Sequence, residues 1–197
     1  MTLSNAASKT KTQYLILTAM MTAFTAICAV ISVPLPFSPV PVSLATLAVL
    51  ICGGLLGPKY GSLSQIIYLL LGAVGVPIFH SFTGGMGILL GPTGGFLFGY
   101  IFMAFTFGLL TDIILKNKRT GDVKATALLF FAAVHATITC YIPGLLWFMV
   151  VTGNGIGTAA SMAVLPFIPV DLFKCIVAAL LVKRLTSILP KGYNIHI

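Results

Sequence analysis

Charged residues are absent from long stretches of this chain, and their absence decides which solvent the folded protein can face. Only 7% of the 197 residues are charged, whereas 58% are hydrophobic. A soluble domain normally carries about a quarter charged residues, so this chain has too few to cover a surface in water. A helix that crosses the hydrocarbon core of a bilayer needs about 20 apolar residues. The pattern therefore predicts an all-α integral membrane protein.

Breaks in hydropathy at glycine, proline and charged residues divide the chain into six expected transmembrane helices. Their approximate ranges are 13–33, 42–56, 61–76, 96–115, 124–151, and a last helix that begins at Pro166 and Pro169 and ends near Leu189. The apolar stretch before Leu165 is expected to be helical or re-entrant. We expect one membrane domain over residues 1–197, with a polar tail at 1–12. The segments 34–41 and 77–95 then form two outer loops.

The positions of the basic residues test this topology. With six spans, both termini and the loops after the second and fourth spans lie on one side of the membrane. Ten of the eleven basic residues fall there: Lys9, Lys11, Lys59, Lys116, Lys118, Arg119, Lys124, Lys183, Arg184 and Lys191. Cytoplasmic loops carry an excess of Lys and Arg, so we expect both termini to be cytoplasmic. Membrane orientation therefore explains the net charge of +8, and the charge does not indicate nucleic-acid binding.

The eleventh cation and one of the three acids lie inside an expected span. Asp112 and Asp122 lie close to the basic loop after the fourth span, but Asp171 and Lys174 lie in the last span, toward its outer end. A spacing of three places both side chains on one helix face. A charge inside the bilayer costs about 2.5–3.5 kcal/mol on insertion scales. A structural salt bridge, or a lysine that extends to the interface, is one interpretation. We favour the other, in which the pair lines a substrate cavity.

A glycine-rich segment supplies further candidates. It lacks the Lys-Ser or Lys-Thr that closes a phosphate-binding loop. Gly87, Gly91, Gly95 and Gly99 recur every four residues, which predicts close helix contacts; alternatively, the segment is irregular backbone over a cavity. The additional candidates for substrate contacts are His80, Thr83, Gly84, Gly85 and Tyr141. Neither the histidines nor the four cysteines have metal-ligand spacing, so we expect no metal site.

The remaining features bear on partners and on chemistry. Ala19 and Ala23 in the first span are four residues apart, which lets another helix pack closely against that face. We find no paired carboxylates, metal cluster or activated nucleophile, so we expect no catalytic residue and no cofactor. An intramembrane enzyme is a remote alternative. A structural or channel-forming subunit is another, which the isolated charged pair disfavours.

Four motifs in this order resemble a known family. They are Leu56-Gly-Pro-Lys-Tyr-Gly61, Leu69-Leu-Leu-Gly-Ala-Val-Gly-Val-Pro77, Gly84-Gly-Met-Gly-Ile-Leu-Leu-Gly-Pro-Thr-Gly-Gly95 and Pro166-Phe-Ile-Pro-Val-Asp-Leu-Phe-Lys174. The chain resembles the BioY family, the biotin-specific substrate-binding (S) subunits of energy-coupling factor (ECF) transporters. An S subunit for another vitamin is the nearest alternative.

The resemblance implies a biotin cavity that opens to the outside of a bacterial cell membrane, with lid loops at 34–41 and 77–95. It assigns Asp171 and Lys174 to the biotin site, where the carboxylate suits the ureido N–H groups and the ammonium suits the valerate carboxylate. It implies that Ala19 and Ala23 dock onto a membrane-embedded coupling protein, which works with two ATPase subunits. The chain departs from the family at Ala45, where many members carry Gln, and at Val170, where many carry Gly.

Overall fold

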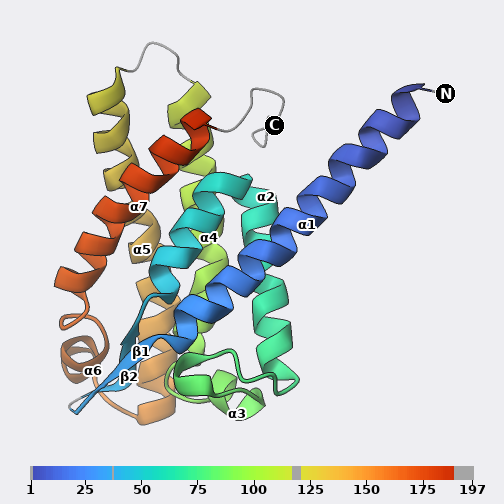
Figure 1. Cartoon of the computed structure of the whole chain (residues 1–197). Helices are drawn as coiled ribbons and strands as arrows, with labels where there is room; N and C mark the ends of the chain where they lie inside the picture. Colours follow the sequence, from blue (N-terminus) through green and yellow to red (C-terminus); the bar gives the residue numbers. More distant parts are fainter. Residues whose placement is uncertain (1, 37, 117–120, 189–197) are drawn as a thin grey trace.

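The structure, a computed structural model, describes residues 2–36, 38–116 and 121–188, with side chains described from residue 12 onward. The helices are α1 (Thr2–Val30), α2 (Ala45–Ala73), α3 (Met86–Leu90), α4 (Gly94–Lys116), α5 (Asp122–Thr152), α6 (Ile156–Ala163) and α7 (Ile168–Ile188), with a short 3-10 helix η1 (His80–Phe82). They pack as a bundle that α1 crosses obliquely (Figure 1). Within the described residues, four helices are long and apolar enough to cross a membrane, or five spans if the bent pair α6–α7 is one. The chain is a multi-pass membrane protein.

Helix α2 contains the sharp break that the sequence predicted between residues 56 and 61. Gly57 adopts a non-helical conformation (φ 73°, ψ −178°), and Pro58 follows it. In a continuous helix Gly53 and Gly61 would lie about 12 Å apart along the axis. Instead, a Cβ built on Gly61 would lie 2.9 Å from the Cα of Gly53. The two halves of α2 therefore fold back on each other (Figure 1).

The segment 34–41, expected to be a loop, instead forms most of a β-hairpin. Strands β1 (Ser32–Leu35) and β2 (Ser38–Ser43) pair antiparallel, with Ser32 opposite Ser43 and Val33 opposite Val42. Prolines fix φ in the extended range and lack a backbone donor. A two-stranded ribbon tolerates them because both of its strands are edges. The first helix accordingly ends at Val30, before the predicted end at residue 33.

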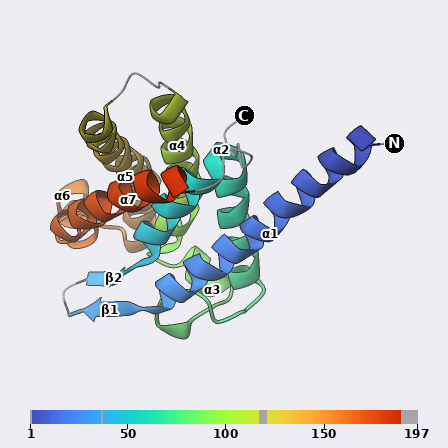
Figure 2. The same cartoon turned by 45° about the horizontal axis from the view of Figure 1, so that its top comes forward.

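The segment 77–95, also expected to be a loop, is partly helical, since it contains η1, α3 and the start of α4. The hairpin, α3 and α6 lie at one end of the bundle, and the turn of α2, the start of α5 and the ends of α4 and α7 lie at the other (Figures 1 and 2). The segments at this second end carry the described basic side chains of Lys59, Lys116, Lys124, Lys183 and Arg184. Lys118, Arg119 and Lys191, and the side chains of Lys9 and Lys11, lie outside the described residues.

Two of the glycines spaced by four let α4 and α5 approach closely. A Cβ on Gly99 would lie 2.8 Å from the carbonyl oxygen and from the Sγ of Cys140, and one on Gly95 would lie 2.3 Å from the Cβ of Trp147. A Cβ on Gly87 would meet nothing within 4 Å. The predicted role in close helix contacts is therefore confirmed for Gly95 and Gly99 and wrong for Gly87, which belongs to the short helix α3.

This contact gives a first prediction. Gly99→Ala should destabilise the protein by about 1–3 kcal/mol, because the added methyl group forces α4 and α5 apart in a close-packed interior. The measurement is the thermal unfolding midpoint in detergent. Gly87→Ala is the matched control, since its methyl group enters open space. Equal midpoints for the two variants would contradict the close contact between α4 and α5.

Candidate functional site

The first two turns of α7 hold the two charged residues that the sequence analysis placed inside the membrane. Lys174 Nζ lies 2.8 Å from Asp171 Oδ1, and both residues are only 5% exposed. The predicted pairing across three positions is thus confirmed. The backbone N–H of Asp171 also donates to the carbonyl of Phe167 at 2.8 Å, which ties the start of α7 to the segment after α6.

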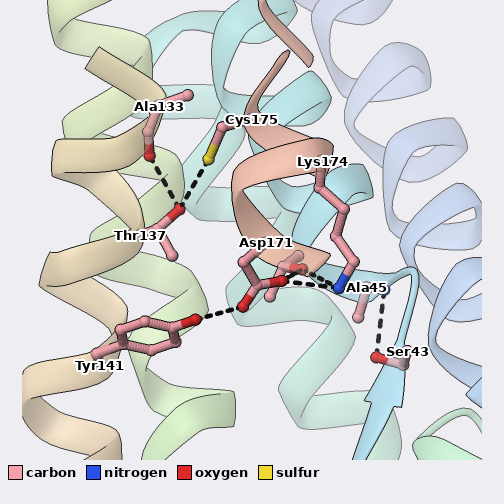
Figure 3. A network of polar contacts seen from close by, with 9 residues as sticks. Ser43, Ala45, Ala133, Thr137, Tyr141, Asp171, Lys174 and Cys175 are labelled. Atoms are coloured by element: carbon pink, nitrogen blue, oxygen red, sulfur yellow. Dashed lines mark hydrogen bonds and ion pairs between the residues drawn. The ribbon is translucent and has the colours of Figure 1, made fainter. Parts of the chain in front are cut away.

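Two residues from other helices complete the network around this ion pair. The Thr46 hydroxyl of α2 donates to Asp171 Oδ1 at 3.1 Å and accepts from Lys174 Nζ at 3.0 Å. The Tyr141 hydroxyl of α5 donates to the other carboxylate oxygen. Figure 3 shows Asp171 between Tyr141 and Lys174. Three helices therefore converge on one carboxylate. Thr46 could not be singled out from the sequence, because a lone threonine is common in an apolar helix.

The network lines a cavity whose empty space, open solvent included, is about 400 Å³. Its walls come from β2, α2, α4, α5, α6 and α7. The lining residues are Val40, Pro41, Ser43, Thr46, Phe96, Tyr100, Cys140, Tyr141, Ala163, Phe167, Asp171 and Lys174. The lining is mostly apolar and aromatic, with the polar groups concentrated at the Asp171 end. Such a cavity suits a ligand with an apolar body and a polar, hydrogen-bonding end.

A second cavity of about 350 Å³ adjoins the first. The two share the wall formed by Val40, Pro41, Ser43, Phe96 and Tyr100. The second cavity is also lined by Ala29, Ala45, Tyr68, His80, Thr93 and Leu97. Residues of strand β2 line both, so the two cavities lie side by side beneath the hairpin.

Of the other sequence candidates, His80 reaches the second cavity. Burial lowers the pKa of His80, so at neutral pH its imidazole is uncharged and offers one N–H donor and one acceptor. Thr83, Gly84 and Gly85 are not among the residues that line either cavity. The Thr83 hydroxyl instead donates to the carbonyl of His80 at 2.7 Å, and the Gly85 N–H donates to the carbonyl of Gly72 at 2.7 Å. These hydrogen bonds hold the backbone of the loop that carries His80.

Two further candidates lie on α1. Ala19 and Ala23 are exposed there, whereas Thr18 and Thr22 on the neighbouring face of the helix are buried. Ala45 is buried in the wall of the second cavity, and its N–H donates to the Ser43 hydroxyl at 3.3 Å (Figure 3). Among the side chains that the structure describes, no group of three or more His, Cys, Asp and Glu residues could hold a metal ion.

Comparison with known proteins decides the family. The BioY family model matches residues 3–191. The chain belongs to the BioY family. The biotin transporter BioY of Thermotoga maritima is 38% identical, over 88% of this chain and 96% of that protein. The biotin transporter BioY of Rhizobium etli is 34% identical, over 86% of this chain and 91% of that protein.

Solved structures agree with this membership in BioY. The crystal structure of the S-component for biotin from an ECF-type ABC transporter matches with a TM-score of 0.82 and 28% identity, covering 100% of this chain and 98% of that one. The S component of a bacterial ECF transporter, 22% identical, matches with a TM-score of 0.60 over 92% of this chain and 99% of that one, and supports the fold. Of the two departures from BioY sequences, Ala45 lines a cavity, whereas Val170 is 38% exposed and lines neither.

The buried ion pair of this BioY chain gives a second prediction. Lys174→Met should destabilise the protein by about 3–5 kcal/mol, because Asp171 would lose its countercharge in an apolar interior. The double variant Lys174→Met/Asp171→Leu should regain much of that loss, since it leaves no unpaired buried charge. Unfolding midpoints in detergent measure both effects.

The control is the ion pair between Lys183 of α7 and the exposed Asp122 of α5, whose N–O distance of 2.7 Å is close to the 2.8 Å of the buried pair. Lys183→Met should change the midpoint little, because solvent screens exposed ion pairs. If Lys174→Met and Lys183→Met had equal effects, the burial of the Asp171–Lys174 pair would have no energetic consequence.

Proposed function

We propose that this chain binds biotin at the outer side of a bacterial cell membrane and mediates its uptake as the S subunit of an ECF-type transporter. One observation carries the proposal: a buried, hydrogen-bonded Asp171–Lys174 pair forms the polar end of an apolar cavity of about 400 Å³. The BioY relatives are biotin transporters. Biotin has the matching chemistry, with an apolar thiophane ring, a ureido group and a valerate carboxylate. The bound biotin is a substrate, and the proposal requires no cofactor.

We place the ureido end of biotin at the ion pair. The two charged groups meet at 2.8 Å, whereas the two ends of biotin are separated by its valerate chain, so one end faces both groups. Ureido N–H groups donate to a carboxylate, and the ureido oxygen accepts from an ammonium. A biotin carboxylate here would instead face the like charge of Asp171. The valerate then extends toward the second cavity and His80. The sequence-based pairing of Lys174 with the carboxylate is the alternative.

Affinity measurements on Lys174→Gln separate the two placements. We expect the variant to bind biotin and biotin methyl ester at least about tenfold more weakly, by similar factors, because a hydrogen bond from a charged group contributes about 1.5–3 kcal/mol. Isothermal titration calorimetry in detergent gives both dissociation constants. Lys183→Gln, on the same helix but in the exposed ion pair, is the control and should bind like the unsubstituted protein.

The other outcomes are equally informative. A loss for biotin without a loss for the ester would place the carboxylate at Lys174. Absence of biotin binding by the unsubstituted protein, with a melting-temperature shift from another vitamin, would replace biotin by that vitamin.

We propose that the chain forms one membrane domain with six spans and both termini in the cytoplasm. The reversal of α2 at Gly57 supports two spans from that helix, and α6–α7 can form one bent span. Apart from Lys174, the described basic side chains belong to segments at one end of the bundle (Figure 1), which suits the cytoplasmic side. The hairpin and η1 then face outward, where they cover the two cavities.

We propose that the exposed alanine face of α1 docks onto the membrane-embedded coupling protein of an ECF module. Leu15 and Ile27, one turn before Ala19 and one turn after Ala23, are 59% and 63% exposed, so the stripe offers apolar side chains on both sides of the small residues. On the neighbouring, buried face, Thr22 donates to the carbonyl of Ser64 at 3.1 Å, which fixes how α1 is rotated. ATP hydrolysis belongs to two partner ATPases in this proposal, and the chain itself is not an enzyme.

Bulky substitution tests this docking face. Ala19→Leu/Ala23→Leu should abolish co-purification of the coupling protein while leaving biotin affinity unchanged, because the added side chains prevent close helix approach on a face remote from the cavities. Ala127→Leu, at an exposed alanine of α5, is the control and should retain the partner. Normal co-purification of the double variant would contradict docking through α1.

A further inference from the structure

The loop that carries His80 is held firmly at both of its ends. Phe79 is fully buried and packs edge-on against Tyr68 at a centroid distance of 5.4 Å, and the Tyr68 hydroxyl donates to the carbonyl of Ile78 at 3.1 Å. At the other end, the N–H of Gly85 donates to the carbonyl of Gly72 at 2.7 Å. The loop ends are thus fixed to the second half of α2, and any movement is concentrated at the tip.

The tip of this loop is strained. Ser81 and Phe82 have φ values of 53° and 58°, in the left-handed region that L side chains rarely adopt. The Phe82 side chain is 72% exposed, so its burial does not offset this strain. A strained non-glycine conformation persists only where surrounding contacts hold it in place.

The hairpin supplies such a contact. The backbone N–H of Ser81 donates to Ser32 Oγ at 3.0 Å, and the two hydroxyl oxygens lie 3.2 Å apart. Ser32 is the first residue of β1 and pairs with Ser43, which lines both cavities. His80, directly before Ser81, lines the second cavity. The Ser32–Ser81 contact therefore joins the two segments that cover the cavities at one end of the bundle (Figures 1 and 2).

We propose that Ser32 and Ser81 form a latch that positions the hairpin and His80 over the cavities and sets the rates of ligand entry and release. The ligand in this inference rests on the proposed function. When the hairpin moves away, Ser81 loses its partner and the left-handed tip can relax, which withdraws His80. The hydrogen bonds favour the closed arrangement and the backbone strain favours the open one. The balance between them determines the open fraction through which biotin exchanges.

Two substitutions shift this balance in opposite directions. Ser32→Ala removes the acceptor, so both association and dissociation of biotin should become about three- to tenfold faster, as expected for one lost hydrogen bond. Ser81→Gly keeps the N–H donor, loses the exposed hydroxyl contact with Ser32 and removes the penalty of a left-handed side chain. Because the strain outweighs that one exposed contact, both rates should become slower than in the unsubstituted protein. Stopped-flow measurements in detergent give the two rates.

Three controls make the result specific. Ser32→Thr retains the hydroxyl and should restore the original rates. Ser161→Ala removes another exposed serine, whose hydroxyl bonds only a carbonyl of its own helix at 2.8 Å, and should change nothing. Rates that move in the same direction in Ser32→Ala and Ser81→Gly, or an effect of Ser161→Ala equal to that of Ser32→Ala, would overturn the latch.

A measurement without ligand keeps this inference separate from the proposed function. Hydrogen exchange of a peptide spanning residues 78–84 should become faster in Ser32→Ala, because the Ser81 amide loses its acceptor. In Ser81→Gly it should stay as slow as in the unsubstituted protein or become slower. Unchanged exchange in Ser32→Ala would overturn the latch even if biotin binds. Failure of the unsubstituted protein to bind biotin would overturn the proposed function, and the exchange data would still decide the latch.

Discussion

The buried ion pair between Asp171 and Lys174 requires hydrogen-bonding partners, and the surrounding structure supplies them. Two charges taken out of water cost several kcal/mol each unless their hydrogen-bonding capacity is filled. The chain meets this demand with hydroxyl groups from two other helices, Thr46 of α2 and Tyr141 of α5. Three helices must therefore meet at one point near the same end of the bundle. The cavity is the space that their apolar neighbours leave beside that point.

The close packing elsewhere makes this meeting point possible. Because α2 reverses at Gly57, its first half runs past α4 and α7 and brings Thr46 to the charged pair, while its second half anchors the loop that carries His80. Gly99 lets α4 contact α5 at backbone distance, which sets the position of Tyr141 one residue beyond Cys140. A substitution at Gly57 or Gly99, although neither residue lines a cavity, would therefore displace Thr46 or Tyr141 from the Asp171–Lys174 pair.

The sequence predicts those features that depend on local spacing or on hydropathy. The membrane class, the break near Gly57 and the pairing of Asp171 with Lys174 follow from composition, a Gly-Pro step and a spacing of three. Thr46 escapes prediction because its partners are 125 and 128 positions away in the chain. The hairpin escapes because proline-rich segments resemble loops, and strand pairing depends on which segments meet in space. Gly84 and Gly85 begin a family motif, yet Gly85, like Thr83 before it, makes hydrogen bonds that hold the backbone beside His80 and does not line a cavity.

The hairpin also has a consequence for how deep the protein lies in the bilayer. A two-stranded ribbon leaves unpaired backbone carbonyls along both of its outer edges, and such groups are not tolerated against acyl chains. The outer edges of the ribbon must therefore face protein or water and not acyl chains. A β-hairpin in this place consequently limits how deeply this end of the bundle can be immersed in lipid.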